Sequence, residues 1–494
     1  MASAAAQPAK IPEVPPRNGA AATSALRRSA YSPAYMSATM AASDFAMLTA
    51  SVLAGFALWR LVNPFIPPLQ PQTLLVPLCC VGVFAGGAQY PGIGLTAVEH
   101  MRRICKGVTM VYLLFLLAMF LAKGSWADSR GALVVAWGLS LPMVTCGRWL
   151  SIRVMARQRW WGVPVLVIGA GHTGRATVRT LRENRVLGYR PMACLDDDPR
   201  KYGMCDGVPV VGTLNEAARV AEDFGIRYAI LAIPGMPRQR LEWHLHRWRR
   251  IFPRILMISE LTGISTHWTE PRDLGGITGF ETHQKLLDPM AQWLKRVIDV
   301  VASAVGLLVA APVLAACALW VRVASPGNPF YIDRREGRGG VPLLIFKLRT
   351  MFPHANEMLE SHLAENPAAR EEWDRFCKLK NDPRILPGVG RVLRKTSLDE
   401  LPQLWNVLKG EMSLVGPRPF ATYHNSRFDA EFQELRRHVR PGLTGLWQVS
   451  ARSDGDLDVQ QTLDTYYIRN WSLWLDIYIL ARTIRAVLAP RGSY

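Results

Sequence analysis

The sequence has 494 residues, carries a formal net charge of +19 at pH 7 and is 49% hydrophobic. A soluble nucleic-acid-binding protein concentrates basic residues without long apolar segments, so this combination argues against nucleic acid as a partner. It favours a membrane protein whose basic face meets anionic lipid or phosphate-rich substrates. The length predicts two or three domains, and eight scattered cysteines without a C-x-x-C pair predict neither a disulfide framework nor a zinc site.

The first part of the chain alternates between a polar tail and apolar segments. Residues 1–40 are rich in alanine, proline and serine, and we expect a disordered tail without a signal peptide. Residues 41–150 contain four segments close to the roughly 20 residues that cross a bilayer as a helix. They are Phe45–Val62, Thr73–Ile93, Gly107–Ala122 and Gly131–Cys146. The shorter third and fourth segments could instead be core helices.

The distribution of charge around these segments predicts their orientation. Cations precede the first segment, dominate the second connection and follow the fourth segment, whereas residues 63–72 carry no charge. Positively charged connections stay on the cytoplasmic side of a membrane. The sequence therefore predicts a four-helix transmembrane bundle with both ends in the cytoplasm.

Residues 160–260 have the pattern of a Rossmann-like α/β domain, which we expect in the cytosol. A short apolar strand, Val163–Ile168, leads into a G-x-G-x-x-G motif that opens a helix, and an aspartate ends the next predicted strand. Rossmann domains place their ribose-binding acid at this spacing. The candidate nucleotide-binding residues are Gly169, Gly171, Gly174 and Asp196. The glycines could also serve only to pack the helix tightly on the strand.

A linker and a second kind of membrane segment follow. Residues 261–290 are rich in glycine and threonine and are predicted to connect two domains. Residues 297–323 are almost wholly apolar, have Pro312 at their middle and are flanked by cations at both ends. A fifth span would place a strongly basic C-terminal domain outside the cell. Because proline removes a backbone hydrogen bond and bends a helix, we expect a re-entrant helix–break–helix instead.

Two adjacent carboxylates, Asp399 and Glu400, stand directly before an apolar helical run that starts near Pro402. The dipole and the unpaired N–H groups of a helix N-terminus favour negative charge there. They would keep an aspartate ionised, so that it can attack an electrophile or bind a metal ion. Ser397 and Glu400 also fit the S-x-x-E capping box, which requires no chemistry. Both interpretations stay open on spacing alone.

Arginine, lysine, glycine and proline surround this acidic pair between residues 331 and 452. The planar fork of arginine suits bidentate phosphate binding, and glycine or proline turns hold such groups rigidly. Mg²⁺ takes one or two carboxylates and completes its shell with substrate phosphates. The sequence therefore predicts a magnesium–diphosphate site with Asp399 and Glu400 as protein ligands.

Five motifs in this region resemble those of the bacterial sugar transferases, which are monotopic phosphoglycosyl transferases. They are Lys347-Leu-Arg-Thr-Met351, Asp382-Pro-Arg384, Thr396-Ser-Leu-Asp-Glu-Leu-Pro-Gln403, Ser413-Leu-Val-Gly-Pro-Arg-Pro419 and Arg440-Pro-Gly-Leu-Thr-Gly445. Together with the four predicted spans and the Rossmann-like domain, they make the chain after residue 40 similar to the large WbaP-like subgroup. That subgroup starts the assembly of O-antigen, capsule or exopolysaccharide on undecaprenyl phosphate.

The resemblance implies a fold and a mechanism. Residues 291–494 would be a monotopic catalytic domain on the cytoplasmic face of the bacterial inner membrane, and the protein would be a homodimer. Asp399 would attack the sugar-proximal phosphorus of UDP-galactose or UDP-glucose, release UMP and pass the phospho-sugar to undecaprenyl phosphate, while Glu400 binds Mg²⁺. The implied phosphate contacts are Lys347, Arg349, Arg394, Arg418 and Arg440. Asp333 and Leu348 depart from the common family pattern, which has glutamine and phenylalanine there.

Two other functions fit parts of the sequence. An NAD-dependent sugar-modifying oxidoreductase would use the glycine motif, but neither Tyr189 nor Tyr202 is followed by a lysine four residues later. A membrane-anchored nucleotide-binding regulator would use the α/β domain without catalysis. The final segment, Trp471–Leu488, has helical periodicity and two tryptophans. It fits either the lipid headgroup plane or packing against the re-entrant element.

Overall fold

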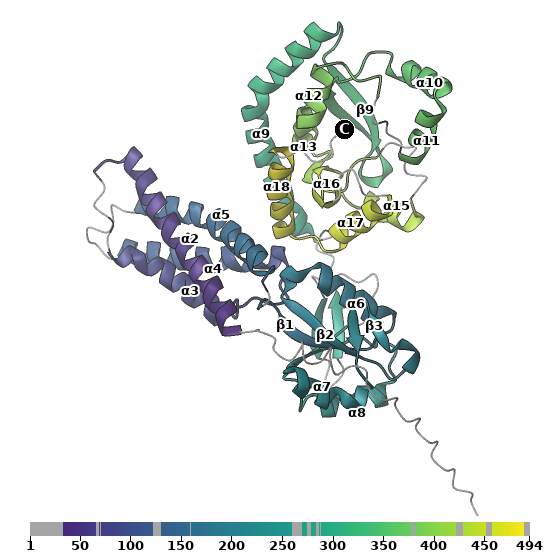
Figure 1. The fold of residues 1–494 in the computed structure, drawn as a ribbon. Helices are drawn as coiled ribbons and strands as arrows, with labels where there is room; N and C mark the ends of the chain where they lie inside the picture. Colours follow the sequence, from purple (N-terminus) through teal and green to yellow (C-terminus); the bar gives the residue numbers. More distant parts are fainter. Residues whose placement is uncertain are drawn as a thin grey trace, which may run out of the picture. The chain divides into compact units, whose positions relative to one another are not determined.

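The structure is a computed structural model with two compact units, Met1–Leu261 and Thr262–Tyr494 (Figure 1). It describes residues 33–65, 69, 71–121, 130–158, 160–258, 269–273, 278–282, 286, 288–376, 379, 382–420, 428–450 and 457–488. Residues 1–32 of the predicted tail lie outside this described part. The architecture is the expected mixture of apolar helices with α/β structure.

The first unit begins with a bundle of apolar helices. Its elements are α2 (Pro33–Val62), the 3₁₀ helix η1 (Pro71–Leu74), α3 (Leu75–Gly86), α4 (Ala97–Leu121) and α5 (Arg130–Met155). Three of them, α2, α4 and α5, are long and apolar enough to cross a membrane. Fully buried side chains such as Leu48, Phe84 and Val108 form one core between the helices.

Two boundaries predicted for this bundle are wrong. Helix α2 begins at Pro33, inside the predicted tail, because Met36 and Met40 are buried against Trp161 and so stabilise an additional two turns. The second predicted span, Thr73–Ile93, ends as a helix at Gly86. The helical run Pro71–Gly86, formed by η1 and α3, extends about 26 Å, shorter than a hydrocarbon core of about 30 Å. The residues after α3 instead join the α/β domain, where the Gly94 amide donates to the Leu187 carbonyl at 2.8 Å.

A buried ion pair joins α2 to α5. The guanidinium of Arg148 donates to both carboxylate oxygens of Asp44 and, at 3.0 Å, to Oε1 of Gln89. The hydroxyl of Tyr90 donates to Asp44 at 2.7 Å. Both charged side chains are essentially inaccessible to solvent. Charges within apolar helices are tolerated when they are paired and hydrogen-bonded, and this pair meets both conditions.

Removal of either Asp44 or Arg148 alone should therefore destabilise the helical bundle far more than removal of both charges together. Asp44→Ala leaves the Arg148 charge buried without its carboxylate and is expected to destabilise the bundle by about 3–5 kcal/mol. The double variant Asp44→Ala/Arg148→Leu removes both charges and should recover most of that loss. Thermal unfolding of the detergent-solubilised protein measures both effects. A double variant that melts no higher than Asp44→Ala would contradict this account.

The rest of the first unit is a Rossmann-like α/β domain, as predicted. Its strands are β1 (Val163–Ile168), β2 (Tyr189–Leu195), β3 (Gly203–Cys205), β4 (Val208–Val210), β5 (Tyr228–Leu231) and β6 (Arg254–Met257). They form one sheet in the order β3-β4-β2-β1-β5-β6, in which only β3 runs antiparallel to its neighbour. The helical elements are α6 (His172–Glu183), η3 (Arg185–Leu187), η4 (Pro199–Lys201), η5 (Leu214–Glu216), α7 (Ala217–Phe224) and α8 (Arg238–Trp248).

The helices cover both faces of this sheet. Val165 and Val167 face side chains of α6, whereas Leu166 and Ile168 belong to the core that α7 and α8 help to form. A parallel strand that is buried on both faces needs a continuous apolar sequence, which β1 has.

The second unit begins with a small antiparallel hairpin, β7 (Thr269–Asp273) and β8 (Thr278–Thr282), within the predicted linker 261–290. Its main part contains two further strand pairs. They are β9 (Phe330–Glu336) with β10 (Pro342–Leu348), and β11 (Ser413–Val415) with β12 (Gly442–Thr444). The helical elements are α9 (Pro289–Ala324), η7 (Arg338–Gly340), α10 (Ala355–Glu365), α11 (Pro367–Phe376), α12 (Val389–Thr396), η8 (Leu398–Gln403), α13 (Leu404–Lys409), α15 (Ala430–Arg437), α16 (Leu446–Ser450), α17 (Leu457–Arg469) and α18 (Leu473–Leu488).

Helix α9 corrects the predicted break at Pro312. The helix is continuous over 36 residues, and Pro312 lies inside it. Figure 1 shows α9 as one coil that changes direction between its ends. A single proline removes only one intrahelical hydrogen bond, so a long apolar helix can bend there without ending.

Both ends of α9 pack on the same body of the second unit. Near its start, Asp299 accepts a hydrogen bond from the Leu414 amide at 3.0 Å. Near its end, Val321 is buried in a core with Leu348 and Leu393. Between these anchors the apolar side chains are exposed, Leu308 by 77%. The middle of α9 is therefore an exposed apolar segment, and both ends of the helix are attached to the body of the second unit.

Helix α18 is anchored in the core at its start. Trp471, directly before it, is buried and donates to Asp476 at 3.0 Å. Lys295 of α9 donates to the same carboxylate at 2.5 Å. The start of this segment therefore packs in the core, while Ile484 near the helix end is 64% exposed; its contact with α9 is at Lys295, before the predicted re-entrant residues, so packing against that element stays a prediction.

Candidate active site

The hairpin β9–β10 is fixed to the following helices by a buried asparagine. Asn406 of α13 accepts a hydrogen bond from the Phe346 amide at 3.1 Å and donates to the Leu344 carbonyl at 2.7 Å. It replaces the strand partner that β10 lacks on this side, and so positions Lys347, the next residue along β10. The sequence analysis missed Asn406, although a polar residue within an apolar helical run was a usable signal.

The two predicted carboxylates lie in the first turn of η8, as expected from the sequence. The alternative capping box is wrong. Ser397 adopts a left-handed conformation with φ 56°, and its side chain makes no capping hydrogen bond. The backbone turns sharply between α12 and η8 at this residue, which leaves Asp399 and Glu400 available for other partners.

Cations surround this pair from three separate segments. Nη2 of Arg418, after β11, lies 3.1 Å from Oε1 of Glu400. Nζ of Lys347 lies 3.9 Å from the same oxygen. Lys347 and Arg394 of α12 both act on Asp399 electrostatically. Three of the five predicted phosphate contacts, Lys347, Arg394 and Arg418, thus gather around the acidic pair.

The environment of Asp399 raises the pKa of its carboxyl group to about 6. Burial is the largest cause and the neighbouring charge of Glu400 is the second, whereas Lys347 and Arg394 oppose the shift. A carboxyl with this pKa is mostly ionised at neutral pH, and it is more basic than an ordinary aspartate. Burial also lowers the pKa of Lys347, although the charge of Glu400 resists this change.

Lys347 has a second carboxylate beside it. Oδ2 of Asp333 on β9 lies 3.8 Å from the Lys347 ammonium and accepts from Nη2 of Arg335 at 2.6 Å. The ammonium group therefore lies between Asp333 and Glu400. Asp333 was noted in the sequence only as a departure from the family pattern, and pairing in register across the hairpin is what brings it here.

Arg394 is held in place by neighbouring polar groups. Its Nε donates to the Thr350 hydroxyl at 3.0 Å. Asp382 also acts on it electrostatically, while Asp382 itself is bound by both Nε and Nη2 of Arg384. The D-P-R motif therefore forms an internal ion pair that supports Arg394.

The structure does not place Arg349 and Arg440 with the acidic pair, and phosphate binding by these two residues stays a prediction. Arg349 donates to the backbone carbonyls of Ser325 and Pro326, at 2.6 and 3.1 Å, and so secures the turn after α9. Arg440 donates to the Gly410 carbonyl at 2.9 Å, beyond the end of α13. Their motif positions are explained by these backbone contacts.

Close backbone packing explains the glycines of the two C-terminal motifs. The Gly442 amide donates to the Pro417 carbonyl at 2.8 Å. A Cβ atom on Gly416 would lie only 2.7 Å from the Arg440 carbonyl oxygen. Larger residues at Gly416 or Gly442 would separate β11 from β12 and displace Arg418 from Glu400.

The donor set is compatible with a partly protein-bound Mg²⁺. Among the residues that the structure describes, no group of three or more His, Cys, Asp or Glu side chains is arranged to hold a metal ion. Asp399 and Glu400 supply two carboxylates, and substrate phosphates and water usually provide the remaining oxygen ligands of Mg²⁺. The pair fits that form of site.

The glycine motif of the α/β domain has a clear packing role. Gly169 has φ 107°, and a Cβ atom there would lie 2.7 Å from the Ala232 carbonyl oxygen. A Cβ atom on Gly174 would collide with the Gly169 carbonyl oxygen, whereas Gly171 has no comparable neighbour. The packing alternative is confirmed for Gly169 and Gly174, and nucleotide binding stays a prediction.

Asp196 lies beside this motif, and its carboxylate is engaged within the domain. Its Oδ2 accepts from the Ala170 amide at 2.8 Å, and the Lys201 ammonium lies 3.1 Å from the same oxygen. A ribose would have to compete with these contacts.

A buried carboxylate that was not predicted from the sequence, Asp464, is subject to the charges of Arg436 and Arg418. Asp464 of α17 is 1% exposed, and its Oδ2 has no hydrogen-bond partner among the described residues. Burial raises the pKa of Asp464 to about 7, while Arg436 and Arg418 oppose the shift. An aspartate within a helical run gave no sequence signal for this position.

Asp464 should make stability depend on pH. An unfolded aspartate has a pKa of about 3.9, so the folded state keeps a proton that the unfolded state releases between about pH 4 and 7. Its stabilising contribution is therefore full at low pH and is lost as pH rises through 7. Asp464→Asn, which stays neutral, should gain in Tm relative to wild type between pH 5 and 8. A Tm difference between Asp464→Asn and wild type that stays constant with pH would contradict this. Asp458→Asn, at an exposed position of the same helix, is the control.

Known protein families match both halves of the chain. Residues 290–490 match the family described as "Bacterial sugar transferase", and residues 91–258 match one described as "CoA-binding domain". The "Undecaprenyl-phosphate galactose phosphotransferase" of Salmonella typhimurium is 32% identical over 88% of this chain and 91% of its own length. The "UDP-glucose:undecaprenyl-phosphate glucose-1-phosphate transferase" of Xanthomonas campestris is 27% identical over 94% of this chain and 97% of its own.

A shorter relative matches less than half of this chain. "Exopolysaccharide production protein ExoY" of Rhizobium meliloti is 45% identical over 42% of this chain and 90% of its own length. The full-length similarity to the Salmonella protein and the family match over the catalytic part lead to the same conclusion. This protein belongs to the bacterial sugar transferase family and is a phosphoglycosyl transferase of the large, WbaP-like kind.

Proposed function

We propose that this protein transfers hexose 1-phosphate from a UDP-hexose to undecaprenyl phosphate, giving undecaprenyl-diphospho-hexose and UMP. The reaction would start O-antigen, capsule or exopolysaccharide synthesis. The observation that supports it most strongly is a buried aspartate, with its pKa raised to about 6, among Lys347, Arg394 and the Glu400–Arg418 pair. A carboxylate among fixed cations suits attack on a diphosphate, whose charge the cations stabilise.

In the first step, an oxygen of Asp399 attacks the sugar-proximal phosphorus, and the bond from that phosphorus to the bridging oxygen of UMP breaks. The leaving UMP takes the electron pair of that bond. In the second step, a phosphate oxygen of undecaprenyl phosphate attacks the same phosphorus, and the Asp399 carboxylate leaves. Lys347 and Arg394 offset the negative charge that develops on the phosphoryl oxygens. Mg²⁺, held by Glu400 and Asp399 with substrate phosphates, would supply further charge neutralisation.

We infer that α9 enters and leaves the bilayer on the cytoplasmic side. Both ends of α9 pack on the same catalytic body, and this supports a re-entrant arrangement because a straight crossing would carry the ends to opposite sides. The exposed apolar middle of the helix would lie in lipid and keep the polyprenyl chain close to Asp399. Location in the bacterial inner membrane and a homodimer are part of the same proposal.

We also propose that the C-terminal unit is sufficient for the chemistry. The support is that the family match covers residues 290–490 alone, and that one relative aligns over 90% of its own length with only 42% of this chain. The bundle and the α/β domain would then serve regulation or assembly. Turnover by a protein that starts at residue 288 tests this, and complete loss of turnover in a folded sample would contradict it.

UMP release is the experiment that tests the proposed function. Purified full-length protein in nanodiscs is given Mg²⁺, undecaprenyl phosphate and either UDP-galactose or UDP-glucose. We expect UMP from one donor and a lipid-linked diphospho-sugar in equal amount, which also identifies the hexose. No UMP from either donor would count against this assignment of substrates.

A further inference from the structure

The backbone around Arg418 is held by hydrogen-bonding groups from two helices, α15 and α17. The hydroxyl of Tyr467, on α17, lies 3.0 Å from the Val415 carbonyl oxygen. Nη2 of Arg436, on α15, donates to the Arg418 carbonyl at 2.5 Å. The guanidinium of Arg418 lies 3.1 Å from Glu400. Arg436 therefore fixes the backbone of a residue whose side chain contacts the acidic pair.

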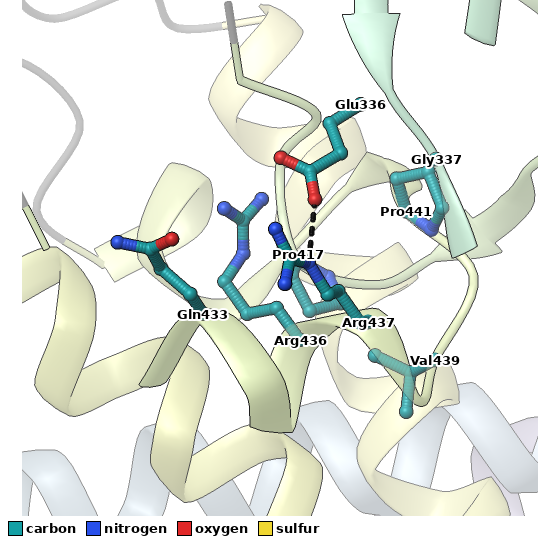
Figure 2. A pocket seen from close by; sticks show the side chains of 8 residues that line it. All are labelled: Glu336, Gly337, Pro417, Gln433, Arg436, Arg437, Val439 and Pro441. Carbon is teal, nitrogen blue, oxygen red and sulfur yellow. Dashed lines mark hydrogen bonds and ion pairs between the residues drawn. The ribbon is translucent and has the colours of Figure 1, made fainter. Parts of the chain in front are cut away.

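Arg436 is held firmly, but one of its donors is unused. Its guanidinium carbon lies 4.0 Å from the centre of the Phe420 ring. Its Nε is buried and has no hydrogen-bond partner among the described residues, which is costly for a donor. Figure 2 shows the Arg436 side chain rising from α15 beside Pro417, while the neighbouring Arg437 pairs with Glu336. The hollow that these residues line has room for about one water molecule.

Asp464 of α17 has a complementary unused acceptor. Its side chain is 1% exposed, and its Oδ2 has no hydrogen-bond partner within the described part of the chain. Helices α15 and α16 pack against α17, and α16 contains no charged residue. The charges that act on Asp464 are those of Arg436 and Arg418, while burial raises the pKa of Tyr467, on the same helix, far above its usual value. An unused acceptor and an unused donor of opposite charge therefore act on each other.

The charge state of Asp464 decides whether these two groups can be satisfied. Burial raises the pKa of Asp464 to about 7, so the neutral and the ionised forms are both present near neutral pH. When Asp464 is ionised, its Oδ2 can accept from Nε of Arg436, directly or through one water, while Nη2 stays on the Arg418 carbonyl. The neutral form offers Arg436 a much weaker partner. A buried carboxylate that costs stability in this way is typical of a functional site.

We propose that Asp464 is a positioning residue for the reaction. Its ionised carboxylate holds Arg436, Arg436 holds the backbone of Arg418, and the Arg418 guanidinium is thereby kept at Glu400, where it contacts the diphosphate. The inference rests on the proposed function, because it takes Arg418 as a phosphate contact. It gives the same ionisation two opposite effects, a loss of stability and a gain of activity.

Asp464→Asn tests the inference, because asparagine has nearly the same shape and resembles the neutral form at every pH. The kcat/KM for UMP release is measured for wild type and variant, as full-length proteins in nanodiscs, between about pH 5.5 and 8.5. Both proteins keep Asp399, so its ionisation cancels in the ratio of wild type to variant. We expect this ratio to be near one at the acid end and about tenfold at the alkaline end, the effect of one charge-assisted hydrogen bond. Its midpoint should lie near pH 7.

Stability separates this role from a merely structural one. Asp464→Asn is expected to have the higher Tm at alkaline pH, so unfolding cannot explain a lower activity there. Asp458→Asn removes an exposed carboxylate from the same helix, and its ratio should stay near one at every pH. A ratio for Asp464→Asn that does not change with pH would overturn the inference.

A double variant tests whether Asp464 acts through Arg436. At about pH 8.5, Arg436→Gln/Asp464→Asn should be no less active than Arg436→Gln alone, because the second substitution has no further contact to remove. Losses that multiply in the double variant would also overturn the inference. If the wild type releases no UMP, the proposed function is wrong and the inference falls with it. An active wild type with a pH-independent ratio contradicts the inference alone.

Discussion

Asp399→Asn is expected to lower UMP release by roughly 10³-fold or more, the largest effect of any single substitution in this protein. An asparagine of nearly the same shape keeps the packing of η8 but cannot form the acyl-phosphate bond. Without acceptor, the wild type should release one UMP per active site and gain the mass of one hexose phosphate. The variant should show neither the burst nor the added mass, and intact-protein mass spectrometry measures this directly.

Two further variants separate nucleophilic attack from a structural role of the same stretch. Ser397→Gly suits the left-handed backbone at this position and should keep activity near wild type, because the serine side chain makes no cap. Glu400→Gln should raise the Mg²⁺ concentration needed for the half-maximal rate, since it removes one proposed ligand. Full activity of Asp399→Asn would show that the nucleophile is elsewhere.

Lys347→Met is expected to reduce kcat/KM by about 10²–10³-fold. The ammonium group is nearly buried between Glu400 and Asp333, so its charge acts on the reacting phosphoryl group with little screening. Methionine has a similar length and no charge, which leaves the two carboxylates without their shared cation. The initial rate of UMP release at low UDP-hexose concentration measures the loss.

Lys409→Met is the matched control for this prediction. Lys409 belongs to α13, and its side chain is 43% exposed. Its ammonium group lies over the ring of Phe346, which is the residue directly before Lys347. It removes the same charge from the same neighbourhood without removing a contact to the acidic pair, so kcat/KM should change by less than about twofold. Equal losses in both variants would mean that overall positive charge, and not the position of Lys347, supports the reaction.

Much of this molecule is encoded in short stretches of sequence. The apolar segments that become α2, α4, α5 and α9 are visible from composition, since a helix long enough to cross a bilayer needs about 20 predominantly apolar residues in a row. The α/β domain follows from a buried strand and a glycine motif that are contiguous in the chain. Asp399 and Glu400 were predicted as candidate site residues for the same reason, because the acidic pair and its flanking motif occupy neighbouring residues.

Length and breaks of helices were predicted less well. Helix α9 runs through Pro312, since the lost hydrogen bond is a small part of a helix of 36 residues. Helix α3 ends at Gly86, since the next residues gain contacts with the α/β domain. In both cases packing between distant segments outweighed the local signal.

The sequence by itself determined which residue types and motifs form the catalytic unit, and only the tertiary structure decided which side chains meet. Of five arginines and lysines predicted at the phosphates, Arg349 and Arg440 bind backbone carbonyls, whereas Lys347, Arg394 and Arg418 surround the acidic pair. Asp333, Asp464 and Arg436 were not predicted, and each lies far along the chain from Asp399. An ionic side chain is stabilised by whichever opposite charge or carbonyl the packed chain brings within a few ångströms, and that partner is set by contacts across the whole fold.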